Sequence, residues 1–488
     1  MVVWWLSLAL IAGAFRRLPE SLFVIAACLV VAFIGRRPAG WCYAALAVAC
    51  VAAGWAEGHR LETDRDAVAR EAGRRGAATV DLEGWVSGFP RTGPHGTSFR
   101  FATQVDGRPV TLEVRAAFFD AAYGDTYRLR ARLLRASGQD GKYLAARGIS
   151  ARARVRLADV TVVAGSQGAR LKREFLWPLH RAARTRLSRA LGSDAGLAIG
   201  VLLGERGTMS EAARVCVRRL GISHLLAISG MHLTAIAACV VLLTRPRPRW
   251  RVPALALSLS LYAGMVGDVD SLTRAYVMSL LLLAAHVTLR PVRALDALAR
   301  TLFLMTLAAP LSIRSVGLQL SLAATFAVLL VLPVLRRRAR PRASWPARAG
   351  ASLARGAGNA FVLSAAVELF IAPLQIHHFG SISLVGPLAT VIFLLPVTTI
   401  LLASIPVAAL SPLPVIHDLL AGALAAASRW TTDLVIAAGT RAPAPVALEA
   451  PHPAVYYAAL ALMWRWRGRW YGWLAGVGGI AASFLIGG

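Results

Sequence analysis

Charged side chains are scarce in this sequence. Asp, Glu, Lys and Arg make up 16% of its 488 residues, and a soluble domain carries roughly 25%. Acidic residues are the scarcest, at 25 against 54 basic ones, and Lys occurs only at Lys142 and Lys172. Hydrophobic residues reach 57%. This composition excludes an ordinary soluble protein and predicts a polytopic α-helical membrane protein with an inserted soluble part.

Cysteine and nucleotide-binding motifs are also rare or missing. The five cysteines include no CxxC pair and no Cys/His cluster, and none lies between 57 and 195. A disulfide framework and a structural zinc site are therefore excluded. The sequence contains no GxxxxGK[ST] motif, so no ATPase site is expected in it. We expect no metal site, no cofactor and no catalytic residue.

The chain divides into regions of contrasting composition. Apolar runs near 2–15, 21–35 and 40–56 open it, without the basic flank of a cleavable signal. A more charged stretch follows, and apolar runs then return. The predicted regions are N-terminal transmembrane helices at 1–56, a soluble β domain at 57–167, an amphipathic interfacial helix at 168–195, a transmembrane domain at 196–440 and C-terminal transmembrane helices at 441–488.

The soluble region shows the period-two alternation of β-strands. About five short strands are expected between 78 and 165, with an Asp-Gly turn in "VDGRP" at 105–109, which suits a small β-barrel or sandwich. Two strands each carry three arginines on one face, namely Arg128, Arg130 and Arg132, and Arg152, Arg154 and Arg156. This ladder is either a solvated face or a phosphate-tracking surface. In the second case, stacking surfaces would come from Phe99, Phe101, Tyr123 and Tyr127.

A helical pattern follows at 168–191, where apolar residues recur every fourth position among arginines. It predicts a helix at the lipid headgroups or one packed on the β domain, with a kink at Pro178. Ten spans are expected beyond it, near 222–244, 252–267, 271–289, 295–310, 314–335, 357–376, 384–409, 414–437, 453–464 and 470–486. With this count all basic loops fall on one side, which the positive-inside rule makes cytoplasmic, and the β domain lies outside.

Polar side chains occur within several predicted spans. They are His224, His232, Arg274, His286, Gln319, Glu368 and Gln375. Such residues are costly in lipid and mark either an internal partner or a water-filled path. Arg274 and Glu368 are candidates for a buried pair, and lining of a pore is the alternative. Pro373, Pro387 and Pro396 interrupt neighbouring spans, as at transporter binding sites.

The segment "GISHLLAISGMHLTAI" at 221–236 concentrates these residues. On a regular helix His224, Ser229 and His232 share one broad face. Two histidines without a carboxylate are a poor zinc site. The remaining alternatives are a serine nucleophile with His286 as its base, a packing seam through Ser229 and Gly230, or the wall of a conduit.

These motifs carry a family resemblance. "VLLGERGTMSEAARVCVRRLGISHLLAISGMHLTAIA" at 201–237 resembles the signature of the ComEC family of competence proteins. "SLTRAYVM" at 271–278, "VGLQLSLAA" at 316–324 and "APLQIHHFG" at 372–380 resemble later family elements, in the same order. "LEGWVSGFPR" and "GKYLAARGI" at 141–149 are similar to the OB-like domain of these proteins. Leu318 departs from the usual family Phe.

The resemblance implies a channel that takes up single-stranded DNA across the bacterial inner membrane during natural transformation, with the OB-like domain outside. The positions that match the family motifs are Gly204, Gly221, His224, Ser229, Gly230, His232, Arg274, Gln319 and Ser321. Many members continue into a metallo-β-lactamase-like domain, whose HxHxDH motif does not occur in this sequence. We therefore expect a form without that domain.

The expected partners follow from this implied function. They are single-stranded DNA, membrane lipids, a DNA receptor, a separate nuclease, a cytoplasmic ATP-driven motor and further copies of the chain. Two other functions remain open from the residues. One is an intramembrane serine hydrolase that uses Ser229, and the other is an exporter of a small anion or lipid.

Overall fold

The structure is a computed structural model of the chain. It describes residues 79–448, except 94–95, 118, 135–143, 145–146, 268, 291, 310–311, 313–314, 339–344 and 410–413, together with scattered positions at 60–68 and 456–480. The chain forms two compact units, which are described separately below. The first comprises Met1–Ser210, Leu226–Leu318 and Val397–Trp430, and the second comprises Glu211–Leu225, Gln319–Pro396 and Thr431–Gly488.

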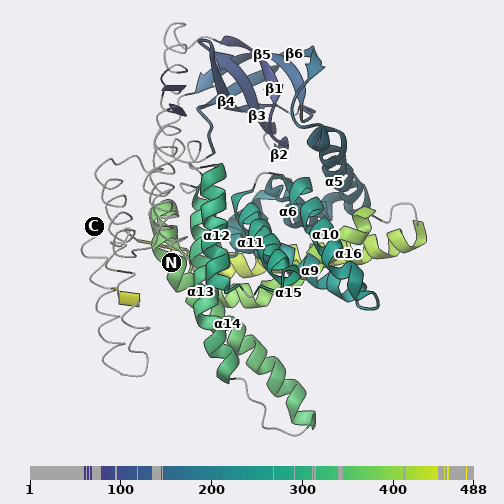
Figure 1. Cartoon of the computed structure of the whole chain (residues 1–488), viewed down its shortest axis with the longest axis vertical. Coiled ribbons are helices and arrows are strands. Elements are labelled where there is room, and N and C mark those ends of the chain that lie inside the picture. Colours follow the sequence, from purple (N-terminus) through teal and green to yellow (C-terminus); the bar gives the residue numbers. More distant parts are fainter. Residues whose placement is uncertain are drawn as a thin grey trace. The chain divides into compact units, whose positions relative to one another are not determined.

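A small β-barrel occupies the start of the first unit (Figure 1). Its strands are β1 (Val80–Val86), β3 (Gly96–Val105), β4 (Arg108–Ala116), β5 (Asp125–Leu134) and β6 (Ala151–Ser166), with the short β2 (Arg91–Gly93) beside β3. The closed order is β1-β5-β6-β4-β3, and β1 pairs with β3 to complete the ring. All these pairings are antiparallel except that of β4 with β6. This is a five-stranded Greek-key barrel of the OB type, so the prediction of an OB-like barrel is confirmed.

Alternation along the strands builds the barrel core. Phe101, Leu112, Leu129 and Ala153 are fully buried, while the residues between them face outward. The predicted turn is present between β3 and β4, where Asp106 and Gly107 both have positive φ, at 50° and 73°. Two positive φ angles are typical of the tight hairpin turn that matches strand twist.

The predicted stacking aromatics belong to this interior. Phe99, Phe101, Tyr123 and Tyr127 are each exposed by 4% or less. Phe99 and Phe101 pack edge to face, and the hydroxyl of Tyr127 donates to Asp125. Burial and this acidic partner raise the pKa of Tyr127. The expectation that these rings stack on DNA bases is wrong, because alternation places them inside the barrel.

The amphipathic helix beyond the barrel packs mainly against protein. A π-helical turn at Lys172–Leu176 precedes α5 (Trp177–Leu191), and Pro178 stands in the first turn of α5. Ala183, Leu187 and Leu191 are buried, and α5 contacts α6 (Ala195–Leu203) and α10. Leu171 and Phe175 at its start remain more than half exposed. Contact with lipid headgroups therefore stays a prediction for that first turn.

Most of the other described residues are helical, apart from a two-stranded sheet of β7 (Ser381–Ile382) and β8 (Val446–Ala447). The helices that lie in the first unit or reach into it are α9 (Gly230–Leu243), α10 (Arg251–Val266), α11 (Asp270–Val287), α12 (Ala294–Ala308) and α16 (Pro414–Arg441). Those that lie wholly or mostly in the second are α7 (Glu211–Arg219), α8 (Ser223–Leu226), α13 (Val316–Arg338) and α14 (Trp345–Phe379). The helix α15 (Gly386–Ala409) begins in the second unit and continues into the first from Val397.

Three of these helices are long and apolar enough to cross a membrane. They cover Val316–Leu335, Gly356–Phe379 and Gly386–Ala409, in agreement with three predicted spans. Four other predicted spans correspond to the helices α10, α11, α12 and α16. The apolar runs before residue 57 lie outside the described residues, as do nearly all positions beyond 448.

Candidate functional site

The signature segment is interrupted rather than continuous. Gly221 follows α7 with a positive φ of 74°, and α8 is a single short turn. Ser229 lies between α8 and α9 with an extended backbone, at φ −140° and ψ −179°. The prediction of one regular span near 222–244, with both histidines and the serine on a shared face, is therefore wrong. The Ser229–Gly230 step begins a new helix instead of continuing the old one.

Ser229 and His232 cap that new helix. The hydroxyl of Ser229 accepts the backbone N–H of Met231 at 3.3 Å. The Nδ1 atom of the fully buried His232 accepts the backbone N–H of Ser229 at 3.3 Å. His232 thus takes the place of the Glu or Gln in a capping box. Sequence reasoning missed this role because it assumed an unbroken helix.

The same geometry does not favour a serine nucleophile. His232 Nδ1 lies 3.5 Å from Ser229 Oγ, which is too long for an effective proton-accepting contact, and it already holds a backbone N–H. The expected base, His286, stands at the far end of α11. Ser271 at the near end donates to the carbonyl of Ile228 at 2.6 Å. At about 1.5 Å rise per residue, His286 lies roughly 20 Å further along the helix.

Signature residues of the first unit gather around this cap. The guanidinium of Arg274, a residue only 5% exposed, lies 3.6 Å from where a Cβ at Gly230 would stand, and Ala275 lies 3.5 Å from it. A Cβ at Gly204, where φ is 77°, would come within 2.9 Å of Ile228. Glycine at position 204 therefore lets the end of α6 approach Ile228 before α9, whereas a Cβ at Gly230 would meet α11 at an ordinary van der Waals distance. Glu368 belongs to the other unit, so its predicted pair with Arg274 stays a prediction.

Signature residues of the second unit gather at the start of α15. A Cβ at Gly221 would come within 2.8 Å of Ser383 and 3.3 Å of Gly386. The hydroxyl of Ser383 donates to the carbonyl of Arg219 at 2.8 Å. His224 is exposed, with Nδ1 3.2 Å from the carbonyl of Gly221 and Nε2 3.3 Å from the hydroxyl of Thr390.

The polar residues of α13 and α14 belong to the same unit. The side chain of Glu368 is hydrogen-bonded to Gln375 on the next turns of α14. Gln319 binds His378 at 2.8 Å, and the carbonyl of Ser321 accepts the hydroxyl of Thr325. Sequence reasoning singled out Gln319, Glu368 and Gln375, but it did not predict that Glu368 bonds to Gln375 or Gln319 to His378.

The prolines predicted to interrupt two spans do not break them, because α14 is continuous through Pro373 and α15 through Pro387 and Pro396. Pro373 still leaves one carbonyl of α14 without its helical N–H partner. Proline has no N–H to donate to the carbonyl four residues earlier, which is that of Leu369. The hydroxyl of the buried Tyr456 donates to this carbonyl at 2.8 Å. Irregular backbone in a membrane segment is tolerated where protein satisfies it in this way.

A joint between the barrel and the helices of the first unit was not predicted. Phe89, in the loop after β1, packs against the rings of Tyr123, Trp177 and His180. A Cβ at Gly207, in the loop after α6, would lie 2.5 Å from the Cα of Gly93 in β2. The loop 204–209 thus touches the barrel backbone directly, and only glycine fits there.

The buried carboxylate of Glu205 binds two residues of α5 at this joint. This carboxylate is 2.8 Å from His180 Nε2 and 3.1 Å from Arg184 Nε, and Glu205 is only 3% exposed. His180 Nδ1 donates to the carbonyl of Met265 at 2.9 Å. Burial lowers the pKa of the neighbouring Arg206, and the charge of Arg91 lowers it further. Two sequence features could have indicated this cluster. One is a single carboxylate directly after an apolar helix, and the other is the pair His180 and Arg184, one turn apart on α5.

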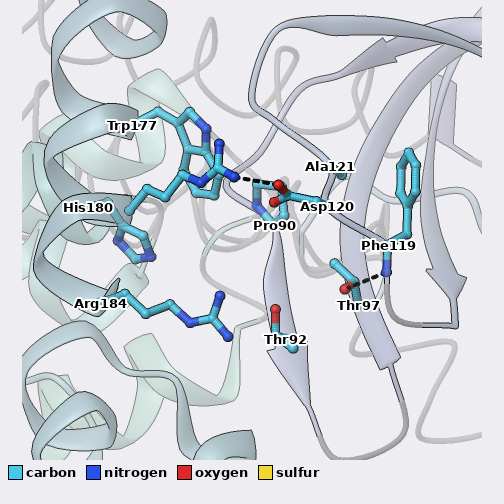
Figure 2. A pocket seen from close by; sticks show the side chains of 10 residues that line it. Pro90, Thr92, Thr97, Phe119, Asp120, Ala121, Trp177, His180 and Arg184 are labelled. Atoms are coloured by element: carbon cyan, nitrogen blue, oxygen red, sulfur yellow. Dashed lines mark hydrogen bonds and ion pairs between the residues drawn. The ribbon is translucent and has the colours of Figure 1, made fainter. Parts of the chain in front are cut away.

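Figure 2 shows the cavity at this joint. It measures about 30 Å³, room for about two water molecules, so it is too small for a nucleotide. Arg181 and Asp120 form an ion pair across its rim. Among the described residues, no group of three or more His, Cys, Asp or Glu side chains is placed to hold a metal ion. The cavity is therefore a small gap in the packing at this joint and not a ligand-binding site.

The arginine ladder divides into paired and unpaired members. Arg128 lies 2.8 Å from Glu83, Arg130 4.0 Å from Asp81, and Arg152 2.7 Å from Glu113. The hydrogen bond and charge of Glu83 raise the pKa of Arg128. The other three ladder members, Arg132, Arg154 and Arg156, are exposed and form no ion pair with any residue that the structure describes.

Strand register places Arg132 and Arg154 in a row of arginines across the barrel, in which Arg115 also lies 3.7 Å from the carboxylate of Glu113. Arg132 of β5 stands opposite Arg154 of β6, which stands opposite Arg115 of β4. The row continues through Ser98 of β3 to Arg91 of β2. Like charges directly opposite each other are destabilising. A bound polyanion would relieve that repulsion.

Most of these features lie in a region of the chain that matches a known protein family. The family model described as "Competence protein" matches residues 201–470, more than half of the 488 residues. This chain belongs to the competence protein family. The matched range begins in α6 and includes the interrupted region at the Ser229 cap and the proline within α14.

One curated relative is ComE operon protein 3 of Bacillus subtilis (strain 168). It is 25% identical over 195 residues, which cover 39% of this chain and 23% of the relative. The match therefore spans about a quarter of that longer competence protein. No solved structure matches the chain.

Proposed function

We propose that this competence protein is an inner-membrane channel that conducts single-stranded DNA into the cell. The observation that carries the proposal is the family match over residues 201–470. On this proposal the helical region spans the membrane and the OB-like barrel lies outside it. A DNA receptor would deliver the substrate, a nuclease would remove the second strand, and an ATP-driven motor would pull from the cytoplasm.

The interrupted helices support a conducting role. DNA phosphates cannot cross hydrocarbon, so their path must be lined by polar groups or by backbone that faces water. The break before Ser229 supplies such backbone within the matched range. Interrupted spans are the features that mark substrate paths in transporters.

The barrel surface supports binding of a single strand outside. The row Arg132, Arg154 and Arg115 presents guanidinium groups at neighbouring strand positions without reading bases. Contacts of this kind bind phosphates in a salt-dependent and sequence-independent manner. Of the six predicted ladder arginines, we therefore assign DNA contact to Arg132, Arg154 and Arg156. Arg128, Arg130 and Arg152 serve mainly to hold neighbouring carboxylates.

A deletion experiment tests the proposal in cells. Labelled double-stranded DNA is given to a transformable host with and without the gene. We expect the deletion strain to hold DNA outside the inner membrane in a nuclease-protected state, with none in the cytoplasm, and a plasmid copy to restore entry. Normal cytoplasmic entry in the deletion strain would contradict the channel.

A further inference from the structure

Glu368 is unusual among the residues of the long apolar helices. The three segments long enough to span a membrane, Val316–Leu335, Gly356–Phe379 and Gly386–Ala409, contain no Asp, Lys or Arg and no second Glu. An ionisable side chain within a span is costly and normally has a function. Glu368 therefore needs a chemical explanation that packing alone does not give.

The neighbours of this carboxyl stabilise charge without neutralising it. Its Oε1 and carboxyl carbon lie 3.9 Å from the Cβ position of Gly386, the first residue of α15. The positive end of a helix stabilises a carboxylate there. Gln375 adds a neutral hydrogen bond. No ion pair with Glu368 occurs in the part of the chain that the structure describes.

Titratable groups of the surrounding elements extend this polar site. From α8, His224 reaches Thr390, which stands one turn beyond Gly386 on α15. From α7, the guanidinium of Arg219 is directed to the carbonyl of Pro443 at 3.5 Å. On α14 itself, His378 is held by Gln319, and His377 packs against His378. The hydroxyl of Tyr456 is bound to the carbonyl of Leu369.

We propose that the carboxyl of Glu368 is a proton-binding site, and that protons cross the membrane region by way of Glu368 and His224. The step is a simple protonation, in which a carboxylate and a proton give a carboxylic acid and no other bond changes. Apolar surroundings accept the neutral acid, and Gln375 with the start of α15 accepts the carboxylate, so both forms have partners. Coupling of this proton movement to DNA rests on the proposed channel function; the proton site itself does not.

Proton flux into vesicles tests the site directly. The purified full chain is placed in liposomes that contain a pH-sensitive dye, and a potassium diffusion potential drives protons inward, with and without single-stranded DNA outside. We expect flux with the wild type, at least a tenfold loss with Glu368→Gln, and partial retention with Glu368→Asp. Glu211→Gln is the matched control, since Glu211 is exposed outside the apolar helices, and it should behave as the wild type.

Two further readouts keep the outcome decisive. Dicyclohexylcarbodiimide attacks protonated carboxyls in apolar surroundings, and mass spectrometry of the treated wild type should show its adduct on Glu368 even if Glu368→Gln folds poorly. Equal flux in wild type and Glu368→Gln, no flux in the wild type, or no adduct would overturn the proton site. DNA passage without proton flux would overturn the proton site and leave the channel, whereas proton flux without DNA passage would do the reverse.

Discussion

At the scale of single residues, the contacts of Ser229 favour a helix-capping role over the role of a nucleophile. Its hydroxyl accepts the N–H of Met231, and His232 completes the cap. Replacing a capping Ser by Ala costs about 1 kcal/mol. We therefore expect Ser229→Ala to lower the melting temperature by a few degrees and to keep most DNA uptake, measured as transformation frequency.

The matched control for this change is Thr234→Ala. Thr234 also bonds only within α9, from its hydroxyl to the carbonyl of Gly230, but it caps nothing. Its stability should stay within about 0.5 kcal/mol of the wild type. Complete loss of function in Ser229→Ala, together with unchanged stability, would restore the nucleophile hypothesis.

Gly207 tests the joint between the barrel and the helices. A Cβ there would meet the Cα of Gly93 at 2.5 Å and the carbonyl oxygen of Thr92 at 2.8 Å, and backbone atoms cannot rotate away. We expect Gly207→Ala to cost about 1–3 kcal/mol and to speed proteolysis in the loop 204–209. The control is Gly422→Ala, because a Cβ at Gly422 meets nothing within 4 Å. Equal melting temperatures for both variants would contradict the joint.

At the scale of elements, the barrel shows which arginines should bind DNA. Changing Arg115, Arg132 and Arg154 together to Ala removes the cross-strand row. Affinity of the full chain for single-stranded DNA should fall by about tenfold or more, and the slope of log K against log salt should become shallower by about 2, since each phosphate contact contributes roughly 0.7. Fluorescence anisotropy over a salt series measures both.

The control changes Arg128, Arg130 and Arg152 instead. It removes the same charge from the same barrel, but from three positions that each have a carboxylate within 4.0 Å, whereas of the three row arginines only Arg115 has one among the described residues, Glu113 at 3.7 Å. We expect at most a threefold loss of affinity. Equal losses in the two triple variants would show that only net charge matters.

Strand-level features were predictable because local chemistry decides them. The alternation of polar and apolar residues predicted which side chains share a face on β5 and on β6, and the Asp106-Gly107 pair predicted the turn. The row of arginines was not predictable, because it depends on which strands pair and in which register. The bulge between Leu129 and Ala131 shifts β6 against β5, and no periodicity within one strand records that shift.

The positions of the long helices were predictable from the lengths of the apolar runs in the sequence. The break before Ser229 was not predictable in this way. The spans expected near 314–335, 357–376 and 384–409 agree with the three long apolar helices. The break before Ser229 escaped prediction because its neighbours are as apolar as any span, and the capping roles of Ser229 and His232 need three-dimensional geometry. Glu205 pairs with His180 and Arg184. These two residues lie some twenty positions earlier in the chain, and no sequence pattern links them to Glu205.

At the scale of the whole molecule, family membership and local geometry answer different questions. The match over residues 201–470 shows the family, and the DNA-uptake channel is our proposal from that match. The structure adds a capped helix break, a glycine joint to an OB-like barrel and a carboxyl set against the start of α15. Two separate units each hold part of the signature.

The most direct test is DNA entry into sealed vesicles that contain only this protein. Labelled single strands are added outside under an inward driving force, external nuclease is then applied, and protected label is counted. The channel account predicts protected single strands with the wild type and none with protein-free vesicles or with double-stranded DNA. Protection no greater than in protein-free vesicles, with correctly folded protein in the membrane, would contradict it.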